Sequence, residues 1–548
     1  MNAIPEHSSA ATRRLAALCA LILLGASGQA LAGEEPAAAK DRPEKGRVVL
    51  SEDFEASEAL RRWSGDARLD AGLGGGRSLR LERKGDRPGP AAVVIDLGAI
   101  ALRGCTLRGS AMIRAEGVTA KPNPWNGIKL MLPIETPARR LWPQAPIETG
   151  TFGWKRAAFT ARIPADATAV RLLLGLEEVS GAVWFDDVRL VIAKPPRPPR
   201  PAQSDAPIPR PADLPRLRGA MVSPRIDEDG LRTLGRDWKA NCMRWQLIRH
   251  GRPGEPSSLG DYDDWLAGEL ERLDAALPRC EKYGLLVVVD LHSPPGGKAT
   301  VSGYVGSDDR LFTDRAAQEK FIDVWRRIAG RYRDSRPVWG YDLANEPVEE
   351  YVEEGCDDWH DLAERAARAI REIDSKHAII VEAPPWGSPD SLAEFEPIDV
   401  PGAVYSAHMY VPAAFTHQGV FRETSRAYSY PGEIEGKAWD RAALEAALAP
   451  VLEFQRSYRV QMYIGEFSAI RWAPDDSAFR YLRDAIDIFE SHGWDWTYHA
   501  FREWQGWSAE HGEDRANAER SPTPTSRERL LREWFSRNER PSWYRPAE

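Results

Sequence analysis

Cysteine is scarce in this chain, which has only five among its 548 residues. The four that follow the amino-terminal segment are far apart in the sequence, and they are Cys105, Cys242, Cys280 and Cys356. No Cys-x-x-Cys pair or histidine cluster has the spacing of a structural zinc site. A chain of this length can bury a core without disulfides, and cysteine pairing cannot be read from sequence. We therefore expect neither a metal nor another cofactor.

Long apolar runs are also lacking. The apolar stretch at 15–26 follows Arg13 and Arg14, and it is shorter than the roughly 20 residues that a membrane span requires. The small residues around Ala30 and Ala32 then form a cleavage site, so that residues 1–32 fit a signal peptide. We expect no membrane span, and a protein secreted to the extracellular space or the periplasm once this segment is removed.

Positive charge is not in excess, because the formal net charge is -9 and charges of both signs are interspersed. Such a surface is a poor partner for nucleic acid. Tryptophan, in contrast, is abundant, with 20 residues. Most of these rings are expected to pack in the core, and the others are candidates to stack on the apolar faces of sugar rings.

A proline-rich stretch at 194–216 divides the chain and favours an extended linker between two domains. Before it, residues 47–193 show short strand-like runs broken by Gly, Pro and Asp turns, which predicts an all-β sandwich of the jelly-roll kind. After it, residues 217–540 alternate apolar strand-like runs with amphipathic helices. Eight such cycles predict a (β/α)8 barrel, whose active site lies at the carboxyl ends of the strands.

The expected barrel strands are 218–223, 242–248, 285–292, 338–345, 379–383, 404–411, 461–467 and 494–501. The expected helices are 262–282, 315–333, 358–374, 441–457, 476–491 and 525–538.

Two of these strand-like runs end on a glutamate, Glu346 in an Asn-Glu-Pro sequence and Glu466 in an Ile-Gly-Glu sequence. A pair of carboxylates is what glycosidic bond cleavage requires, because one group protonates the leaving oxygen while the other attacks or activates water. The ends of the other expected strands also carry polar or aromatic residues, which include Arg244, His292, His408, Tyr410 and Trp504. Their joint placement on one barrel predicts an active site.

With this set of residues the chain resembles glycoside hydrolase family 5, in the retaining clan of (β/α)8 glycosidases, over roughly residues 217–540. That family places an Arg on the second strand, a His after the third, Asn-Glu after the fourth, His-x-Tyr on the sixth, Glu on the seventh and an aromatic residue after the eighth. The sequence has a candidate for each position.

The resemblance implies that Glu346 acts as general acid and then base, while Glu466 is the nucleophile. It also implies a set of substrate-binding residues around this pair, namely Arg244, His292, Asn345, His408, Tyr410 and Trp504. Among them, Arg244 and Tyr410 would hold the Glu466 carboxylate. Trp504 would stack on a sugar, with Trp507 as a competitor for that role.

These expectations describe a secreted hydrolase of β-linked polysaccharide or oligosaccharide that acts as a monomer. An endo-β-glucanase is favoured, and mannan or xylan remain open as substrates because one scaffold of this family serves them all. A transglycosylase and a non-catalytic glycan-binding barrel are the alternatives. A metal-dependent hydrolase built on Asp290 and the site histidines is disfavoured, since closely spaced His pairs are missing.

The run at 182–191 resembles the last strand of carbohydrate-binding-like jelly rolls. A sugar-binding domain would hold the catalyst near an insoluble polysaccharide. A spacer or a module that packs against the barrel is an equally open interpretation of residues 47–193.

Overall fold

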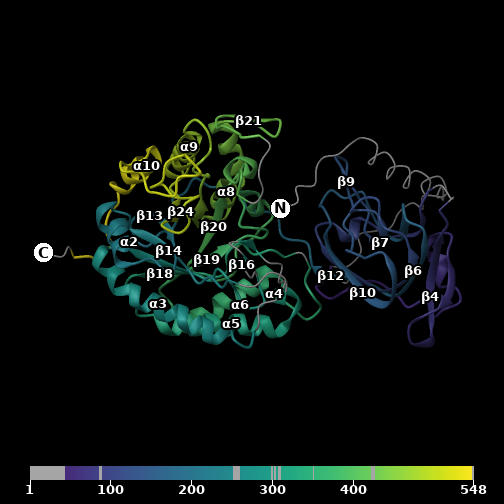
Figure 1. The fold of residues 1–548 in the computed structure, drawn as a ribbon. Helices are drawn as coiled ribbons and strands as arrows, with labels where there is room; N and C mark the ends of the chain where they lie inside the picture. Colours follow the sequence, from purple (N-terminus) through teal and green to yellow (C-terminus); the bar gives the residue numbers. More distant parts are fainter. Residues whose placement is uncertain are drawn as a thin grey trace. The chain divides into compact units, whose positions relative to one another are not determined.

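The structure is a computed structural model, and it describes residues 43–85, 89–250, 259–297, 300–301, 304–305, 310–349, 351–420 and 426–545. The expected signal peptide at 1–32 lies outside these residues. The chain divides into two compact units between Pro199 and Arg200, within the proline-rich stretch (Figure 1). No helix among the described residues is long and apolar enough to cross a membrane.

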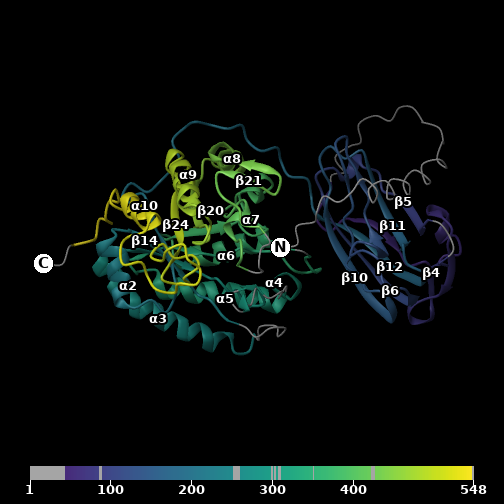
Figure 2. The same cartoon turned by 45° about the horizontal axis from the view of Figure 1, so that its top comes forward.

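The first unit is a sandwich of two antiparallel sheets, as predicted (Figure 2). One sheet has the order β10-β6-β12-β4-β3 with β1 beside β12, and the other has the order β2-β5-β11-β8-β9 with β7 beside β11. The strands are β1 (Val48–Glu52), β2 (Ser64–Gly65), β3 (Arg68–Ala71), β4 (Arg77–Arg83), β5 (Ala91–Asp96), β6 (Thr106–Val118), β7 (Gly127–Met131), β8 (Ile134–Glu135), β9 (Arg140–Leu141), β10 (Gly150–Arg162), β11 (Ala169–Glu177) and β12 (Gly181–Lys194).

The sandwich core follows from the period of two in its strands. Buried residues of β6 alternate with more exposed ones along most of its length, as expected for a strand with one face on a core. Its inward side chains, such as Leu107 and Ile113, join those of β11, such as Leu172 and Leu174, in one apolar cluster. The two sheets therefore stabilise each other by burying their facing apolar sides.

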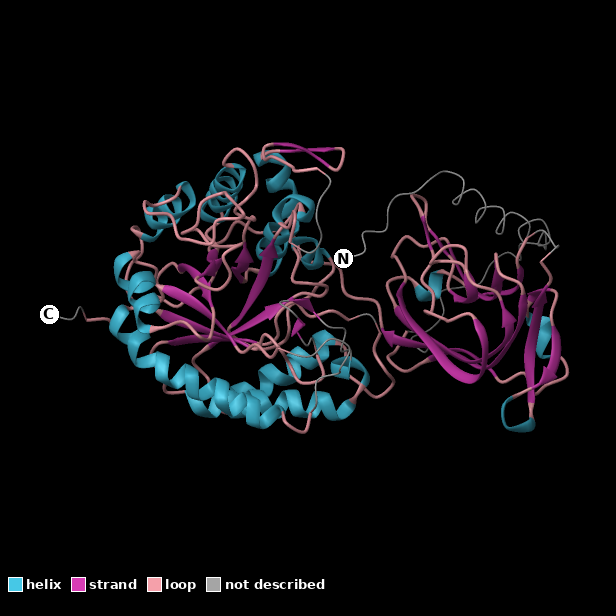
Figure 3. Cartoon of the chain, in the orientation of Figure 1, coloured by secondary structure: helices cyan, strands magenta, loops and turns pink. Residues whose placement is uncertain are grey.

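The second unit contains a closed parallel barrel, which confirms the predicted fold (Figure 3). Its strands in order are β13 (Arg218–Val222), β14 (Cys242–Gln246), β15 (Leu286–Asp290), β18 (Val338–Asp342), β19 (Ala378–Glu382), β20 (Ala403–Met409), β23 (Gln461–Phe467) and β24 (Asp495–Phe501). Nearly every residue of these strands is buried, because each strand lies between the barrel interior and the surrounding helices. Two short hairpins lie in loops, β16–β17 (Thr300–Val301, Tyr304–Val305) and β21–β22 (Gly432–Ile434, Lys437–Trp439).

Helices cover the outside of the barrel (Figure 1). They are α2 (Glu228–Arg232), α3 (Tyr262–Tyr283), α4 (Arg310–Thr313), α5 (Arg315–Tyr332), α6 (Trp359–Arg371), α7 (Ala413–Thr416), α8 (Arg441–Tyr458), α9 (Ser477–Ser491) and α10 (Ser526–Phe535). Capping residues fix several of their starts: Asp358 accepts a hydrogen bond from the backbone N–H of Asp361, and Thr525 accepts one from that of Glu528. These bonds satisfy amide groups that the helix itself leaves unpaired.

The barrel interior changes from apolar to polar along the strands. A small apolar cluster near its amino-terminal end contains Cys242, Val288 and Ile380. Residues two positions further along a strand point to the same face. The next inward residues of these three strands are therefore Arg244, Asp290 and Glu382, which are fully buried. Strand periodicity thus builds a polar layer at the carboxyl-terminal end.

The residues that follow Pro199 already contact the barrel unit. The guanidinium of Arg200 donates to the backbone carbonyls of Leu392 (2.6 Å) and Ala393 (2.8 Å). Further along, Arg210 forms an ion pair of 2.7 Å with Asp495, a buried residue at the start of β24. The later part of the proline-rich stretch is therefore tied to the barrel by charged hydrogen bonds.

Candidate active site

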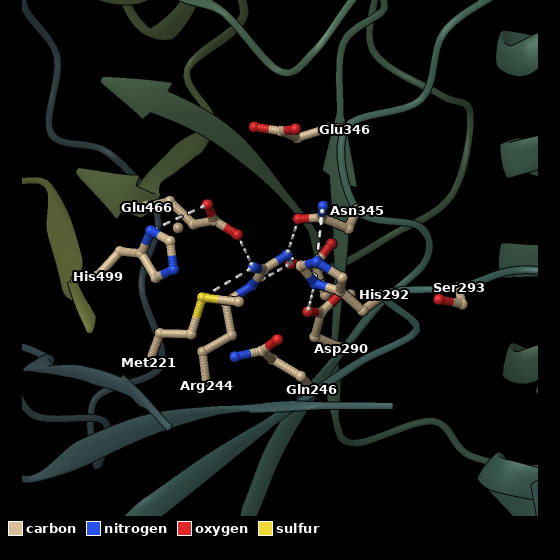
Figure 4. A network of polar contacts seen from close by, with 12 residues as sticks. Met221, Arg244, Gln246, Asp290, His292, Ser293, Asn345, Glu346, Glu466 and His499 are labelled. Carbon is tan, nitrogen blue, oxygen red and sulfur yellow. Dashed lines mark hydrogen bonds and ion pairs between the residues drawn. The ribbon is translucent and has the colours of Figure 1, made fainter. Parts of the chain in front are cut away.

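Arg244 on β14 is the centre of the polar layer, and its side chain is fully buried. Within 3.1 Å, its guanidinium contacts the carboxylates of four residues that come from four other strands; they are Asp290, Asp342, Glu382 and Glu466. We call these five residues the arginine network. Its Nη2 also donates to the amide oxygen of Asn345 at 3.0 Å, and Figure 4 shows the guanidinium between Glu466 and Asn345. A planar fork of donors suits this arrangement, in which one cation serves several acceptors.

Both oxygens of Glu466 are held by donors. Its Oε1 accepts from Arg244 Nη1 at 2.6 Å and its Oε2 from the Tyr410 hydroxyl at 2.9 Å. Burial by itself would raise the pKa of this carboxyl, but the positive charges of His408, His499 and Arg244 outweigh burial and lower it. Glu466 is therefore ionised and fixed in one orientation at neutral pH.

Glu346 lies just after β18, and its side chain is the more accessible of the two glutamates, 19% exposed against 6% for Glu466. One of its oxygens lies 3.0 Å from Nδ1 of His408 on β20. Burial would lower the pKa of His408, but Glu382 and Glu466 raise it well above its usual value. His408 is therefore positively charged and donates a hydrogen bond to Glu346.

The two glutamates face each other across a short distance. One atom each of Glu346, His408 and Glu466 lies within 4.8 Å of the other two. Glu346 and Glu466 form a carboxylate pair, in which the surroundings of Glu466 favour its ionised form. The carboxylate pair therefore places the more accessible carboxyl of Glu346 beside a buried carboxylate that is held ionised.

A model of the cellulase family, glycosyl hydrolase family 5, matches residues 210–505, which is more than half of the chain. The chain belongs to glycosyl hydrolase family 5. Endoglucanase C of Acetivibrio thermocellus is 31% identical over 271 residues, which are 44% of this chain and 75% of that protein. Cellodextrinase A of Ruminococcus flavefaciens is 25% identical over 225 residues, 40% of this chain and 64% of that protein.

Among solved structures, endoglucanase Cel5A of Thermotoga maritima is 23% identical with a TM-score of 0.42, and the match covers 54% of this chain and 92% of that one. The family and the curated relatives establish this protein as an O-glycosyl hydrolase that acts on β-glycans. The family 5 hydrolase takes a polysaccharide as its substrate.

The polar residues predicted as the site come together around the carboxylate pair. His292 bridges two of them, because its Nδ1 lies 2.8 Å from Asp290 and its Nε2 lies 3.3 Å from the Asn345 amide nitrogen. His292 fits these partners when its Nδ1–H donates to Asp290 and its Nε2 accepts from the Asn345 amide. The Asn345 amide is thus fixed at both ends, by His292 and by Arg244. It is oriented before a sugar binds.

Trp504 lies after β24, and 39% of it is exposed. Its ring stands edge-on to Trp472 and to Trp507, with centroids 5.8 Å and 5.7 Å away. Trp507, in contrast, is 7% exposed and packs on Tyr410 and on His499. An exposed ring can stack on a sugar and a buried one cannot, so Trp504 is the better candidate for the platform.

Sequence reasoning missed His499, which lies inside the site on β24. Its Nδ1 is hydrogen-bonded to the Tyr410 hydroxyl and lies 3.8 Å from Glu466, and its Nε2 lies 3.5 Å from Glu503. Burial would lower the pKa of His499, but Glu503 and Glu466 raise it. The family pattern of an aromatic residue after the eighth strand indicated Trp504 instead. The period of two in β24 turns Thr497 and His499 inward, and this pattern could have indicated His499.

Two acidic residues of the arginine network were also missed. Glu382 ends β19 and Asp342 ends β18, each on the inward face and with no exposed surface. Burial raises the pKa of Asp342 well above its usual value, and Glu382 and Asp290 add to this, against the opposing charge of Arg244. The raised pKa favours the neutral form of Asp342, which reduces the excess of negative charge around one arginine.

The four cysteines of the described residues are free thiols. Cys242 and Cys280 are fully buried, and burial raises the pKa of both thiols. They are unreactive core residues.

Proposed function

We propose that this family 5 hydrolase cleaves β-linked glucan with retention of anomeric configuration, with Glu346 as acid and base and Glu466 as nucleophile. The observation that carries the proposal is the short separation of the carboxylate pair, whose nearest atoms lie within 4.8 Å. Retaining enzymes hold their two carboxyl groups about 5–5.5 Å apart, whereas inverting enzymes leave about 6.5–9.5 Å for a water molecule. The separation here favours direct attack by a carboxylate.

In the first step, a Glu466 oxygen attacks the anomeric carbon while Glu346 gives its proton to the glycosidic oxygen. The bond from the anomeric carbon to that oxygen breaks, and a glycosyl ester of Glu466 forms. Arg244 and Tyr410 hold the attacking carboxylate in place, so little reorganisation is needed in the transition state.

In the second step, Glu346 is a carboxylate and takes a proton from water, whose oxygen attacks the same carbon and releases Glu466. His408 lies 3.0 Å from Glu346 and donates to it, which stabilises the carboxylate that exists between the two steps. The charged histidine thus favours proton donation by Glu346 in the first step. The pair returns to its starting charge after the second step.

The proposed substrate is a β-1,4-glucan cut at internal bonds. Curated relatives are named endoglucanases and a cellodextrinase, which supports a glucan backbone. Trp504 supplies an exposed aromatic face next to the site, as a glucan chain requires. Asn345 offers a fixed amide to a sugar hydroxyl group.

The test compares sugar release from soluble glucan, mannan, xylan and mixed-linkage polymers by the parent protein and three variants. Glu466→Ala and Glu346→Ala should each lose activity by orders of magnitude while their folds are retained. Glu433→Ala, which removes an exposed glutamate from the β21 hairpin, is the matched control and should keep parent activity. Azide should restore part of the activity of the Glu346 variant, because an external anion can resolve the glycosyl intermediate. Near-parent activity of either carboxylate variant would refute the assignment.

We also propose that the protein is exported and that residues 1–32 are then removed. Arg13 and Arg14, the apolar stretch at 15–26 and the small residues before Gly33 support this address. Amino-terminal sequencing of protein from the culture medium or the periplasm should begin at Gly33. A protein that stays in the cytoplasm with this segment intact would contradict the proposal.

A further inference from the structure

Glu382 is a single buried carboxylate on which three parts of the candidate site converge. Its Oε2 accepts the backbone N–H of Glu346 at 2.8 Å. Its Oε1 accepts from Arg244 Nη2 at 3.1 Å and lies 3.1 Å from Nε2 of His408. The acid, the arginine that holds the nucleophile and the charged histidine between them thus share one partner.

The hydrogen bond from the Glu346 backbone N–H to Glu382 lies at a residue with an unusual backbone conformation. Glu346 has a φ of 45°, in the left-handed region that residues with a side chain rarely adopt. Such a conformation persists only where its surroundings hold it. A charged acceptor on the Glu346 N–H is a strong contact of this kind, so Glu382 helps to determine the direction in which the Glu346 side chain points.

The contact with His408 is an ion pair that stabilises the positive charge of the ring. The charged groups that face this imidazole are Glu346 and Glu466 at Nδ1, at 3.0 Å and 3.8 Å, and Glu382 at Nε2. The Glu382 carboxylate at 3.1 Å from Nε2 favours the charged form of the imidazole, in which both ring nitrogens carry a proton. Nδ1–H is then directed at the carboxylate pair, where negative charge passes from Glu466 to Glu346 during the first step.

The backbone packs closely against the side chains of Glu382 and His408. A Cβ atom on Gly387 would lie 2.6 Å from Oε2 of Glu382, and one on Gly465 would lie 2.9 Å from Nε2 of His408. The indole nitrogen of Trp359 donates to the Glu382 carbonyl at 2.6 Å. Two glycines therefore give room for the Glu382–His408 pair, and any larger residue would displace it.

We propose that Glu382 is a positioning residue of this glycosidase, which fixes the acid segment and His408 through one carboxylate. It touches no substrate, because it is fully buried beneath the site. The proposal rests on the proposed roles of Glu346 and Glu466. It predicts an effect on turnover and on the pH profile rather than on substrate binding.

The test is Glu382→Gln, which keeps the shape and removes the charge. Without that charge the pKa of His408 should fall, since Glu382 is the largest influence that raises it. The pKa of Glu466 should then rise, since His408 is the largest influence that lowers it. We expect kcat to fall at least 100-fold with KM within threefold of the parent, and the acidic limb of kcat/KM to move to higher pH.

Glu490→Gln is the matched control, because Glu490 is a largely buried carboxylate paired with another buried arginine, Arg218, at the opposite end of the barrel. It should lower stability and leave the pH profile unchanged. Glu382→Asp keeps the charge on a shorter side chain, and it should lower kcat at least tenfold while the acidic limb stays at the parent position. If the glutamine variant does not fold, Glu382→Asp tests the positioning role of Glu382 in its place.

The proposal would be overturned if Glu382→Gln had the parent kcat and the parent pH profile. If the glutamine variant does not fold, the same result for Glu382→Asp would overturn it. The same holds if Glu490→Gln moves the acidic limb equally, since the effect would then be one of general stability. Loss of the proposed function itself is recognised separately, because Glu466→Ala would then match the parent protein in the polymer assay.

Discussion

Replacing Arg244 with lysine tests whether the arginine network sets the charge of the nucleophile. The guanidinium reaches Asp290, Asp342, Glu382 and Glu466 from three nitrogens at distances of 2.6–3.1 Å. Lysine keeps the positive charge but has one nitrogen on a flexible stem, which cannot reach acceptors on four different strands at once. Arg244→Lys therefore separates the geometry of the contacts from the presence of a charge.

The expected loss of stability follows from the contacts. At least two of the charged hydrogen bonds must be lost, and each contributes about 1.5–3 kcal/mol, so the free energy of unfolding should fall by about 3–6 kcal/mol. Stabilities of about 5–15 kcal/mol are typical of single domains. The variant should therefore still fold, with a clearly lower denaturant midpoint.

The expected change in activity concerns the acidic limb of kcat/KM. Burial raises the pKa of Glu466 and the charges of His408, His499 and Arg244 lower it, so a less closely placed charge at position 244 should raise it. Glu466 must be ionised to attack, and activity falls as the pH drops through its pKa. The limb should consequently lie at higher pH in Arg244→Lys than in the parent.

Arg218→Lys is the matched control, since Arg218 is a buried arginine with a bidentate contact to Glu490 at the amino-terminal end of β13. Both variants should be destabilised, and only Arg244→Lys should move the acidic limb. Urea denaturation and pH–rate profiles measure these two effects. The prediction is wrong if the acidic limbs of the parent and both variants coincide, or if the free energy of unfolding of Arg244→Lys is unchanged.

Three further predictions concern the surroundings of the carboxylate pair. Asp342→Asn should match or exceed the parent in stability at pH 7, by a margin that vanishes below about pH 4. The raised pKa of Asp342 contributes to the stability of the parent fully below pH 3.8, and this contribution is lost as the pH rises. Thermal unfolding across pH measures this, and a less stable variant at pH 7 would contradict it. Trp504→Ala should raise KM for glucan about 2–10-fold with an unchanged melting temperature, as expected for a stacking contact of about 0.5–1.5 kcal/mol. Trp507→Ala should instead lower the free energy of unfolding by about 3–5 kcal/mol, because that ring is buried. The reverse pattern would exchange the roles of the two residues. Excess EDTA should leave activity unchanged, because both oxygens of Glu466 already accept hydrogen bonds from protein donors, and loss of activity that zinc or magnesium restores would indicate a metal site instead.

Strand and helix periodicity was enough to predict the barrel, because parallel strands that are buried on both faces leave long apolar runs in the sequence. The Asn-Glu-Pro sequence around Glu346 was recognisable because two polar residues follow an apolar strand there. Glu382 also ends an apolar strand. It was not recognised because a single strand-end glutamate is common, and only the folded barrel brings it next to His408 and Arg244.

The protonation states of the site depend on proximities that no spacing in the sequence reveals. Burial raises the pKa of Asp342, and Asp290 and Glu382, which lie 52 residues before it and 40 residues after it, raise it further. His499 reaches the site because the inward face of β24 continues to that residue. The order of strands in the sandwich likewise follows from long-range pairing, such as β1 with β12.

Trapping the covalent intermediate would show directly whether Glu466 is the nucleophile. A 2-deoxy-2-fluoro-β-cellobioside with a good leaving group slows both steps and should let the glycosyl enzyme accumulate. We expect a mass increase of one fluorinated cellobiosyl group, mapped by peptide sequencing to Glu466 and missing from Glu466→Ala. Turnover of the unfluorinated substrate with inverted anomeric configuration, or an adduct on a different residue, would contradict it.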